Sequence, residues 1–249
     1  MDLPSLFNAN FARPPAESRR RRGGPLDGPI KESEVATAVE LASFRPPLTL
    51  EGRYVRLTPL ALADATDLHR AASDPEVRRY LVLPPGPGVA DTETVIATLL
   101  GRQAAGTDLP FTTRRRDTGE VVGMTRFLHI DPENESVEIG GTFVDRRYWR
   151  TPVNTDAKLV LLRHAFETAH AHRVSLQTDL RNERSQTAIA RLGAVREGVR
   201  REDRLLPDGY RRSSVVFSIL ASEWPSVRDR LSRALESTWS FPTSRTERR

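Results

Sequence analysis

A long amphipathic helix between two predicted strands constrains the fold of this chain more than any other feature. Residues 136–144 and 174–180 are rich in β-branched and apolar side chains, which predicts strands. The segment between them, to about residue 172, carries apolar side chains at helical spacing, namely Leu159, Leu162, Ala165, Phe166 and Ala169. Such a stripe packs against a core, so we expect a crossover helix that covers one face of a sheet.

The rest of the chain alternates between strand and helix signals. Further strands are predicted at residues 53–58, 111–116, 121–128, 195–206 and 210–220, and further helices from residue 64, at 89–105, at 185–192 and from residue 222. Asp117-Thr118-Gly119 and Pro207-Asp208-Gly209 predict hairpin turns, and Gly193 ends a helix. This order predicts an α+β fold with a mixed, mostly antiparallel central sheet of about seven strands flanked by helices.

The sequence divides into one domain and two tails. Residues 1–45 hold Pro14-Pro15, Gly23-Gly24 and the run Arg19 to Arg22, a composition that buries little apolar surface. We expect a disordered or loosely attached N-terminal tail at 1–45, with a short helix at 34–44, a single domain at 46–237 and a C-terminal tail at 238–249. The arginine run fits a solvated basic arm better than an arm that contacts nucleic acid or the ribosome, which stays an alternative.

Composition excludes several kinds of site. The chain has no cysteine, so it offers no disulfide, no thiolate metal site and no cysteine nucleophile. Its five histidines occur without a metalloprotease motif, so we expect no metal. The net charge of +5 comes almost wholly from arginine, since Lys31 and Lys158 are the only lysines. No apolar run reaches the roughly 18 residues of a membrane span and no signal peptide is evident, so we expect a cytoplasmic protein that engages no membrane.

Six groups of residues, in order along the chain, resemble the motifs of one known family. They are Val137-Glu138-Ile139-Gly140, Tyr148-Trp149 with Asn154-Thr155-Asp156-Ala157-Lys158, His164-Ala165-Phe166-Glu167, Asp179-Leu180-Arg181-Asn182-Glu183-Arg184-Ser185, Arg191-Leu192-Gly193-Ala194 and Pro207-Asp208-Gly209. In this order and spacing they resemble the GNAT superfamily of N-acetyltransferases, in its RimJ/RimL-like branch of protein N-terminal acetyltransferases. The resemblance covers residues 48 to about 235.

The resemblance implies a GNAT-type sheet and an acetyl-CoA-dependent enzyme. Acetyl-CoA would donate the acetyl group, and a primary amine, either a protein N-terminal α-amine or the amine of a small molecule, would attack the thioester directly. An α-amino group has a pKa of about 7.7 to 8.0, so it needs little help to lose its proton near neutrality. A CoA-binding regulatory protein that has kept the fold and lost turnover is the alternative, and a homodimer is compatible with the resemblance.

The turn before the long helix is the expected site for the pyrophosphate of acetyl-CoA. A helix N-terminus presents unpaired N–H groups and the positive end of the helix dipole. The family motif there has the form Gln/Arg-x-x-Gly-x-Gly/Ala, and this chain departs from it at Trp149, Pro152 and Asn154. The expected cofactor-binding residues of this turn are Arg150, Thr151, Val153, Asn154 and Thr155, with Arg150 as a compensating cation. The alternative is an ordinary turn capped by Thr151.

Two more segments are implied by the resemblance to hold the pantetheine arm. The free edge of the strand at 136–144 would pair with the arm through three residues, Thr142, Phe143 and Val144. Gly140-Gly141 permits a bulge beside them. Asn182 and Ser185 match the Asn-x-x-Ser motif of the family, although both are also common helix-capping residues.

Glu138 and Ser185 are the candidate catalytic residues. Glu138 alternates with Val137 and Ile139 along its strand, which points it away from their face and toward the expected cleft. We therefore assign it as the general base, with an exposed carboxylate in a salt bridge as the alternative. Ser185 is assigned to protonate the leaving thiolate, and this assignment depends on the resemblance.

Overall fold

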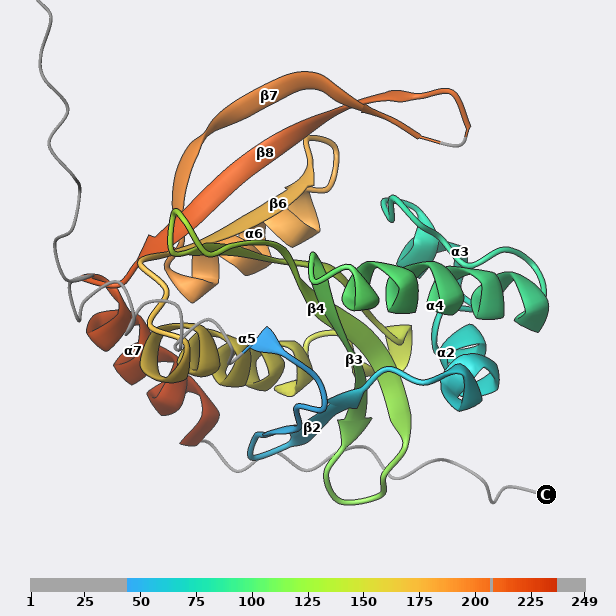
Figure 1. Ribbon diagram of the computed structural model, residues 1–249, viewed down its shortest axis with the longest axis horizontal. Helices are drawn as coiled ribbons and strands as arrows, with labels where there is room; N and C mark the ends of the chain where they lie inside the picture. The colour runs from blue at the N-terminus through green and yellow to red at the C-terminus, as the bar shows by residue number, and fades with distance from the viewer. Residues whose placement is uncertain (1–43, 207, 237–249) are drawn as a thin grey trace, which may run out of the picture.

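The computed structural model describes residues 44–206 and 208–236, which form one eight-stranded sheet with helices on both faces (Figure 1). The strands are β1 (Leu50–Glu51), β2 (Val55–Pro59), β3 (Asp108–Arg115), β4 (Val121–Asp131), β5 (Ser136–Val144), β6 (Arg173–Asp179), β7 (Val195–Leu205) and β8 (Arg211–Leu220). Their order is β1-β2-β3-β4-β5-β6-β8-β7, and every neighbouring pair is antiparallel except β5 and β6. The predicted α+β fold is confirmed, and the additional strand is β1, whose two residues are too few to give a sequence signal.

The helices divide into two groups on opposite sides of the sheet. They are α2 (Ala65–Ala71), α3 (Pro75–Arg78), α4 (Val89–Ala104), α5 (Val153–Arg163), α6 (Glu183–Leu192) and α7 (Trp224–Glu236), with short 3-10 turns η2 (Leu62–Asp64) and η3 (Arg146–Tyr148). Figure 1 shows α5 and α7 on one side of β3 and β4, and α2 and α4 on the other. Each group has its own apolar core, one around Leu161 and Leu162 and one around Leu68 and Leu99. None of the described helices is long and apolar enough to cross a membrane.

The helix after β5 changes type before its apolar stripe ends. α5 stops at Arg163, and the chain continues in one π-helical turn, η4 (His164–Thr168), where Ala169 N donates to His164 O at 2.9 Å. The wider turn still buries Ala165 and Phe166, so the stripe looks continuous in the sequence. The prediction of one helix to about residue 172 was wrong for this reason.

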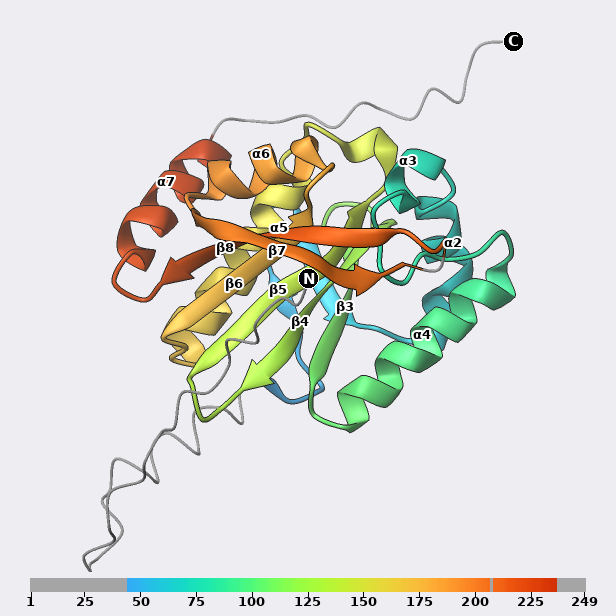
Figure 2. The same cartoon turned by 90° about the horizontal axis from the view of Figure 1, so that it is seen from above.

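The β7–β8 hairpin passes above the rest of the sheet. Seen from above, it lies across β4 and β5 and reaches toward the side of α2 to α4 (Figure 2). Its end is tied to the segment after α3 by Arg181, whose guanidinium carbon lies 3.4 Å from the Tyr210 ring centre and 5.7 Å from that of Tyr80. The hairpin and α3 therefore face each other across the space above β5.

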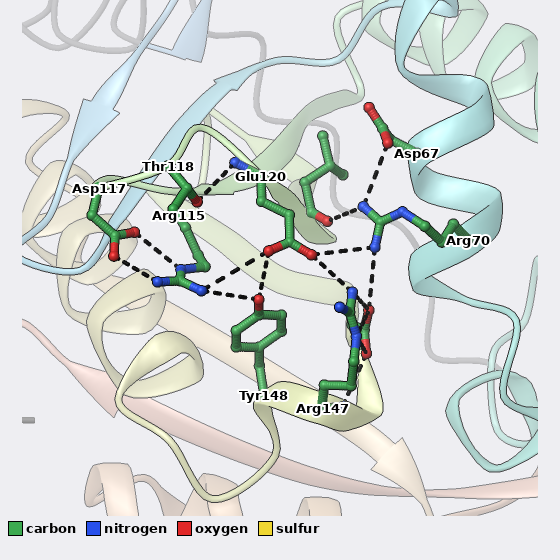
Figure 3. A network of polar contacts seen from close by, with 10 residues as sticks. Asp67, Arg70, Arg115, Asp117, Thr118, Glu120, Arg147 and Tyr148 are labelled. Atoms are coloured by element: carbon green, nitrogen blue, oxygen red, sulfur yellow. Dashed lines mark hydrogen bonds and ion pairs between the residues drawn. The ribbon is translucent and has the colours of Figure 1, made fainter. Parts of the chain in front are cut away.

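Charged side chains tie the β3–β4 turn to η3 and α2 (Figure 3). Glu120 accepts hydrogen bonds from Tyr148 Oη at 2.6 Å, Arg147 Nη2 at 2.8 Å and Arg70 Nη1 at 3.3 Å, and Arg115 donates to Tyr148 Oη at 3.1 Å. Further ion pairs join Arg70 to Asp67, Arg115 to Asp117 and Arg147 to Asp145. We call Glu120, Tyr148, Arg70, Arg115 and Arg147 the Glu120 network, and each of its guanidinium groups faces a carboxylate.

The predicted tails lie almost wholly outside the described residues. The N-terminal tail at 1–45 and the short helix at 34–44 contribute little more than Phe44, and the C-terminal tail at 238–249 contributes nothing. The Phe44 ring packs edge-on against Phe127, with 4.9 Å between ring centres. The first described residue is thus part of the core on the α5 side.

Candidate active site

The parallel strands β5 and β6 stay paired over only three residues. The pairs are Ser136 with Arg173, Val137 with Val174 and Glu138 with Ser175. Beyond Glu138, residues 139–144 of β5 pair with β4 alone within the described part of the chain. One edge of β5 is therefore free, and the opening expected from the resemblance is present beside Thr142, Phe143 and Val144.

A β-bulge in β5 lies at this opening. Two residues, Gly141 and Thr142, oppose the single residue Thr125 of β4. Gly141 has a φ of +55°, and a Cβ added there would lie 2.9 Å from Arg126 Cζ. A side chain at this position would be strained and crowded, which accounts for the glycine.

A cavity of about 1000 Å³ passes through the opening. It reaches from the start of α5, along the free edge of β5, to the sheet face that carries Glu138 and Arg126. The predicted site residues that line it are Glu138, Thr142, Phe143, Val144, Arg150, Thr151, Asn154, Thr155, Asn182 and Ser185. Val153 is the exception, because its side chain is fully buried in the core and only its backbone N–H, 3.4 Å from Thr151 Oγ1, faces the turn.

Glu138 lies inside the cavity. Only 5% of the residue is exposed, and its Oε2 accepts a hydrogen bond from Gln177 Nε2 at 2.8 Å and lies 3.0 Å from His129 Nδ1. Within the described residues no hydrogen bond uses Oε1, and the only ion-pair partner is His129. The carboxylate is therefore buried and not exposed, as the alternative had it, and its contact with His129 becomes an ion pair when the imidazole is protonated. Oε1 has no partner among the described residues.

The start of α5 supplies hydrogen-bond donors to the cavity. Pro152 is the N-cap, and the first intrahelical bond runs from Asp156 N to Pro152 O at 2.8 Å. The N–H groups of Asn154 and Thr155 precede that bond and have no acceptor in the helix. Arg150 stands beside them with a φ of +62°, and its guanidinium makes no hydrogen bond or ion pair among the residues described.

Asn182 caps α6, as the competing interpretation proposed. Its Oδ1 accepts from Ser185 N at 3.0 Å. Its Nδ2 and the Ser185 hydroxyl have no hydrogen-bond partner in the described part of the chain, and both residues line the cavity. Nearby, Arg184 lies over the Trp149 ring at 3.4 Å, and Trp149 Nε1 donates to Val144 O at 2.8 Å. Capping thus uses Asn182 Oδ1, and it leaves Asn182 Nδ2 and the Ser185 hydroxyl able to contact a ligand in the cavity.

Lys158 is a cavity residue that the sequence analysis did not assign to the site. It projects from α5 to the bulge, where its Nζ donates to Thr142 Oγ1 at 2.6 Å and to Thr125 Oγ1 at 3.4 Å. No carboxylate of the described residues lies within ion-pair distance of it, and burial lowers its pKa from 10.5 to about 7. Its place four residues before Leu162, on the apolar stripe, is the signal that could have indicated it.

The described residues contain no cluster of side chains that could hold a metal ion. Among residues 44–206 and 208–236, no three His, Asp or Glu side chains are placed to hold a metal ion.

An opened mixed sheet above a helix N-terminus is the arrangement that the resemblance to acetyltransferases implies. The family described as "Acetyltransferase (GNAT) domain" matches residues 55–195, and this chain belongs to that family. The match covers the strands β2 to β6, the opening between β5 and β6, and the helices that flank it.

Individual relatives agree with this placement. A crystal structure of a candidate acetyltransferase from T. thermophilus is 43% identical, with a TM-score of 0.70, over 76% of this chain and 97% of that chain. YdaF of Bacillus subtilis (strain 168), named as a candidate ribosomal N-acetyltransferase, is 30% identical over 106 residues, 43% of this chain and 57% of YdaF. RimJ of Mycobacterium smegmatis, solved in complex with CoA-disulfide, shares the fold at 24% identity and a TM-score of 0.65, over 76% of this chain and 95% of that chain. These similarities support the RimJ/RimL-like branch.

Proposed function

We propose that this acetyltransferase uses acetyl-CoA and transfers the acetyl group to a primary amine, either a protein N-terminal α-amine or the amine of a small molecule. The observation that carries the proposal is the cavity that joins the start of α5, the free edge of β5 and buried Glu138. By analogy, the CoA ligand of RimJ supports acetyl-CoA as the donor. The name of YdaF, a candidate ribosomal N-acetyltransferase, supports the acceptor class.

The described residues fit the donor at three places. The N–H groups of Asn154 and Thr155 and the Arg150 guanidinium suit its pyrophosphate. The edge of β5 at Thr142, Phe143 and Val144 that faces away from β4 offers backbone groups to the amides of its pantetheine arm, except for Val144 O, which accepts from Trp149 Nε1. Asn182 Nδ2 and the Ser185 hydroxyl supply further donors on the α6 side.

The reaction needs one base and one acid. When bound, acetyl-CoA supplies an activated acetyl thioester, whose carbonyl carbon gains a bond to the amine nitrogen and loses its bond to sulfur. Glu138 Oε1 takes the proton from the amine and later releases it to solvent. The Ser185 hydroxyl protonates the departing thiolate and regains its proton from solvent water, so both residues return to their starting states. Backbone N–H groups of the bulge stabilise the negative charge that develops on the thioester oxygen.

Two measurements test the proposal in sequence. Isothermal titration should show binding of acetyl-CoA, and thiol release should then exceed the blank with at least one member of a panel of N-terminal peptides and small amines. Glu138→Gln should lower kcat by about 10²-fold or more while acetyl-CoA still binds. Glu133→Gln, an exposed carboxylate in the β4–β5 turn, is the matched control.

The outcomes separate the alternatives. An absence of heat at millimolar acetyl-CoA would sink the proposal. Binding without thiol release from any amine would favour the CoA-binding regulatory protein instead. Full activity of Glu138→Gln would leave the transferase standing and remove Glu138 as its base.

A further inference from the structure

Arg212 on β8 is a buried cation that has no hydrogen-bond or ion-pair partner among residues 44–206 and 208–236. Only 5% of the residue is exposed, its Nε has no hydrogen-bond partner, and no hydrogen bond or ion pair of its guanidinium occurs within the described residues. Burial lowers its pKa, as expected for a charge removed from water. Buried charges are normally paired, so an unpaired one that lines a cavity indicates a missing anion.

The carboxylates nearest to Arg212 are already engaged. Asp179 accepts from Arg181 at both oxygens, at 3.1 Å and 3.0 Å, and Asp203 lies 3.9 Å from Arg204. Both attract Arg212 electrostatically, as does Glu138, but none comes within ion-pair distance. The residues that the structure describes therefore do not supply the counterion.

Other arginines gather on the same side of the cavity. Arg126 is 6% exposed and has Asp108 Oδ2 at 3.2 Å, while its Nε lacks a well-aligned hydrogen bond. Arg204 pairs with Arg212 across β7 and β8, and Arg102 also lines the cavity. Four guanidinium groups and two carboxylates, Asp108 and Glu138, line this part of the cavity. Asp179 and Asp203 do not line it and are paired with Arg181 and Arg204, so the lining itself carries an excess of positive charge.

This cluster lies on the face of the sheet that carries Glu138. Ser175 pairs with Glu138 on one side and with Ser218 on the other, which places all three side chains on one face. Arg212 is six residues from Ser218 along β8, an even number, and so points to that same face. The start of α5, where the pyrophosphate is proposed to bind, is a separate region with its own cation, Arg150.

We propose that the arginine cluster of Arg102, Arg126, Arg204 and Arg212 binds an anionic group, a carboxylate or a phosphate, carried by the same molecule as the acceptor amine. This anion site rests on the proposed function, because only a transferase has an acceptor amine. Arg212 and Arg126 would hold the anion while the amine reaches Glu138. Polyamines and other purely cationic amines are then disfavoured, because they would bring positive charge to a positive surface.

Matched acceptors test this inference by kinetics. Phosphoethanolamine is compared with ethanolamine, and the peptide amide Ser-Asp-Gly with Ser-Asn-Gly. Since a hydrogen bond to a charged group contributes about 1.5 to 3 kcal/mol, the anionic member of the productive pair should have a kcat/KM at least about tenfold higher. The pair that shows this gap identifies the source, a small molecule or a protein N-terminus.

Variants assign the effect to Arg212. Arg212→Gln should bring the ratio of kcat/KM values within a pair close to one, and Arg212→Lys should restore part of it. Arg211→Gln is the matched control, because Arg211 is the exposed neighbour on the opposite face of β8 and does not line the cavity. Thermal melting of each variant shows that the fold is intact.

A binding measurement keeps this inference separate from the transferase activity. In the presence of saturating CoA, inorganic phosphate should raise the melting temperature of the wild-type protein above that in sodium chloride of equal ionic strength. Arg212→Gln should abolish this rise and Arg211→Gln should keep it. Phosphate stabilisation that depends on Arg212 without acetylation of any amine would uphold the anion site and count against the transferase. Equal rates within both pairs, or phosphate stabilisation indifferent to Arg212, would overturn the anion site.

Discussion

Two sets of cations in this molecule differ in what surrounds them. In the Glu120 network, Arg70, Arg115 and Arg147 each face a carboxylate within 3.4 Å (Figure 3). Around the cavity, Lys158 meets only threonine hydroxyls and Arg212 meets no partner among the described residues. Burial alone would raise the pKa of Glu120, but its hydrogen bonds outweigh that effect and lower it, whereas burial prevails at Lys158 and Arg212, whose pKa values fall.

The difference separates paired charges, which stabilise the fold, from unpaired charges, which the proposals above make available to a ligand. A paired cation keeps most of its electrostatic stabilisation without any other molecule. An unpaired buried cation costs stability in the free protein and recovers it when an anion or a neutral state becomes available. Four measurements test whether the two sets of cations differ in this way.

The largest expected effect is a pH dependence at Lys158. Its pKa is depressed from 10.5 to about 7, so between these values the unfolded chain binds a proton that the folded protein does not. Raising the pH removes that preference and favours the fold. The stability of the wild type relative to Lys158→Met should rise by about 3 kcal/mol from pH 7 to pH 10, measured by urea unfolding. Parallel pH curves for the two proteins would show that Lys158 titrates normally.

The next largest effect is expected from removing the Glu120 carboxylate, which lies at the centre of the Glu120 network. Glu120→Ala leaves Arg147 and Tyr148 without their shared acceptor and should destabilise the protein by about 2 kcal/mol, a value reduced for partial exposure of the site. The midpoint of urea unfolding measures it. Glu133→Ala, an exposed carboxylate, serves as the control and should change stability little. Equal effects of the two variants would remove the Glu120 network from the stabilising features.

A smaller effect separates binding from stability at the mouth of the cavity. Arg150→Ala should weaken acetyl-CoA binding by about tenfold, because one charge-assisted contact is lost, and should leave the unfolding midpoint unchanged. Isothermal titration measures the affinity. Arg163→Ala, an exposed arginine at the other end of α5, is the control. If Arg150→Ala binds acetyl-CoA as tightly as the wild type, then Arg150 does not compensate for the glycines of the family motif that this chain lacks.

The smallest effect has opposite signs in the two sets. Arg212→Met should raise stability by about 1 kcal/mol, because it removes an uncompensated buried charge, whereas Arg115→Met should lower it by a similar amount. Both variants keep a long side chain, so their melting temperatures can be compared directly. A loss of stability in both would mean that Arg212 is paired in solution.

The sequence was sufficient for most of the fold, because periodicity and turn signals are local. The Asp117-Thr118-Gly119 turn and the Gly193 helix end occur where local chemistry places them, and Gly193 has the left-handed φ of +93°. The change from α5 to η4 escaped prediction, because Ala165 and Phe166 remain buried in this π-helical turn and so keep the apolar stripe unbroken in the sequence.

Less of the candidate site could be predicted. Strand alternation was enough to direct Glu138 away from the core, and the resemblance supplied the opening beside Thr142. Lys158 and Arg212 were missed as cavity residues, since what marks them is the absence of an ion-pair partner among the described residues, which only the fold shows. Arg211 and Arg212 are adjacent and identical in the sequence, and only the fold makes one exposed and the other buried.

The three-pair junction between β5 and β6 also makes the sheet mechanically uneven. Strands β1 to β5 form one section of the sheet and β6 to β8 another, and among the described strands the two sections pair only at residues 136–138 and 173–175, next to the backbone hydrogen bonds that Glu135 O accepts from His172 N and Arg173 N. Since few strand-to-strand hydrogen bonds cross this junction, we expect the two sections to move relative to each other here more readily than the strands within either section do. A molecule bound in the gap beyond the junction would contact both sections of the sheet. Binding there would restrict their relative movement and make the whole sheet more rigid.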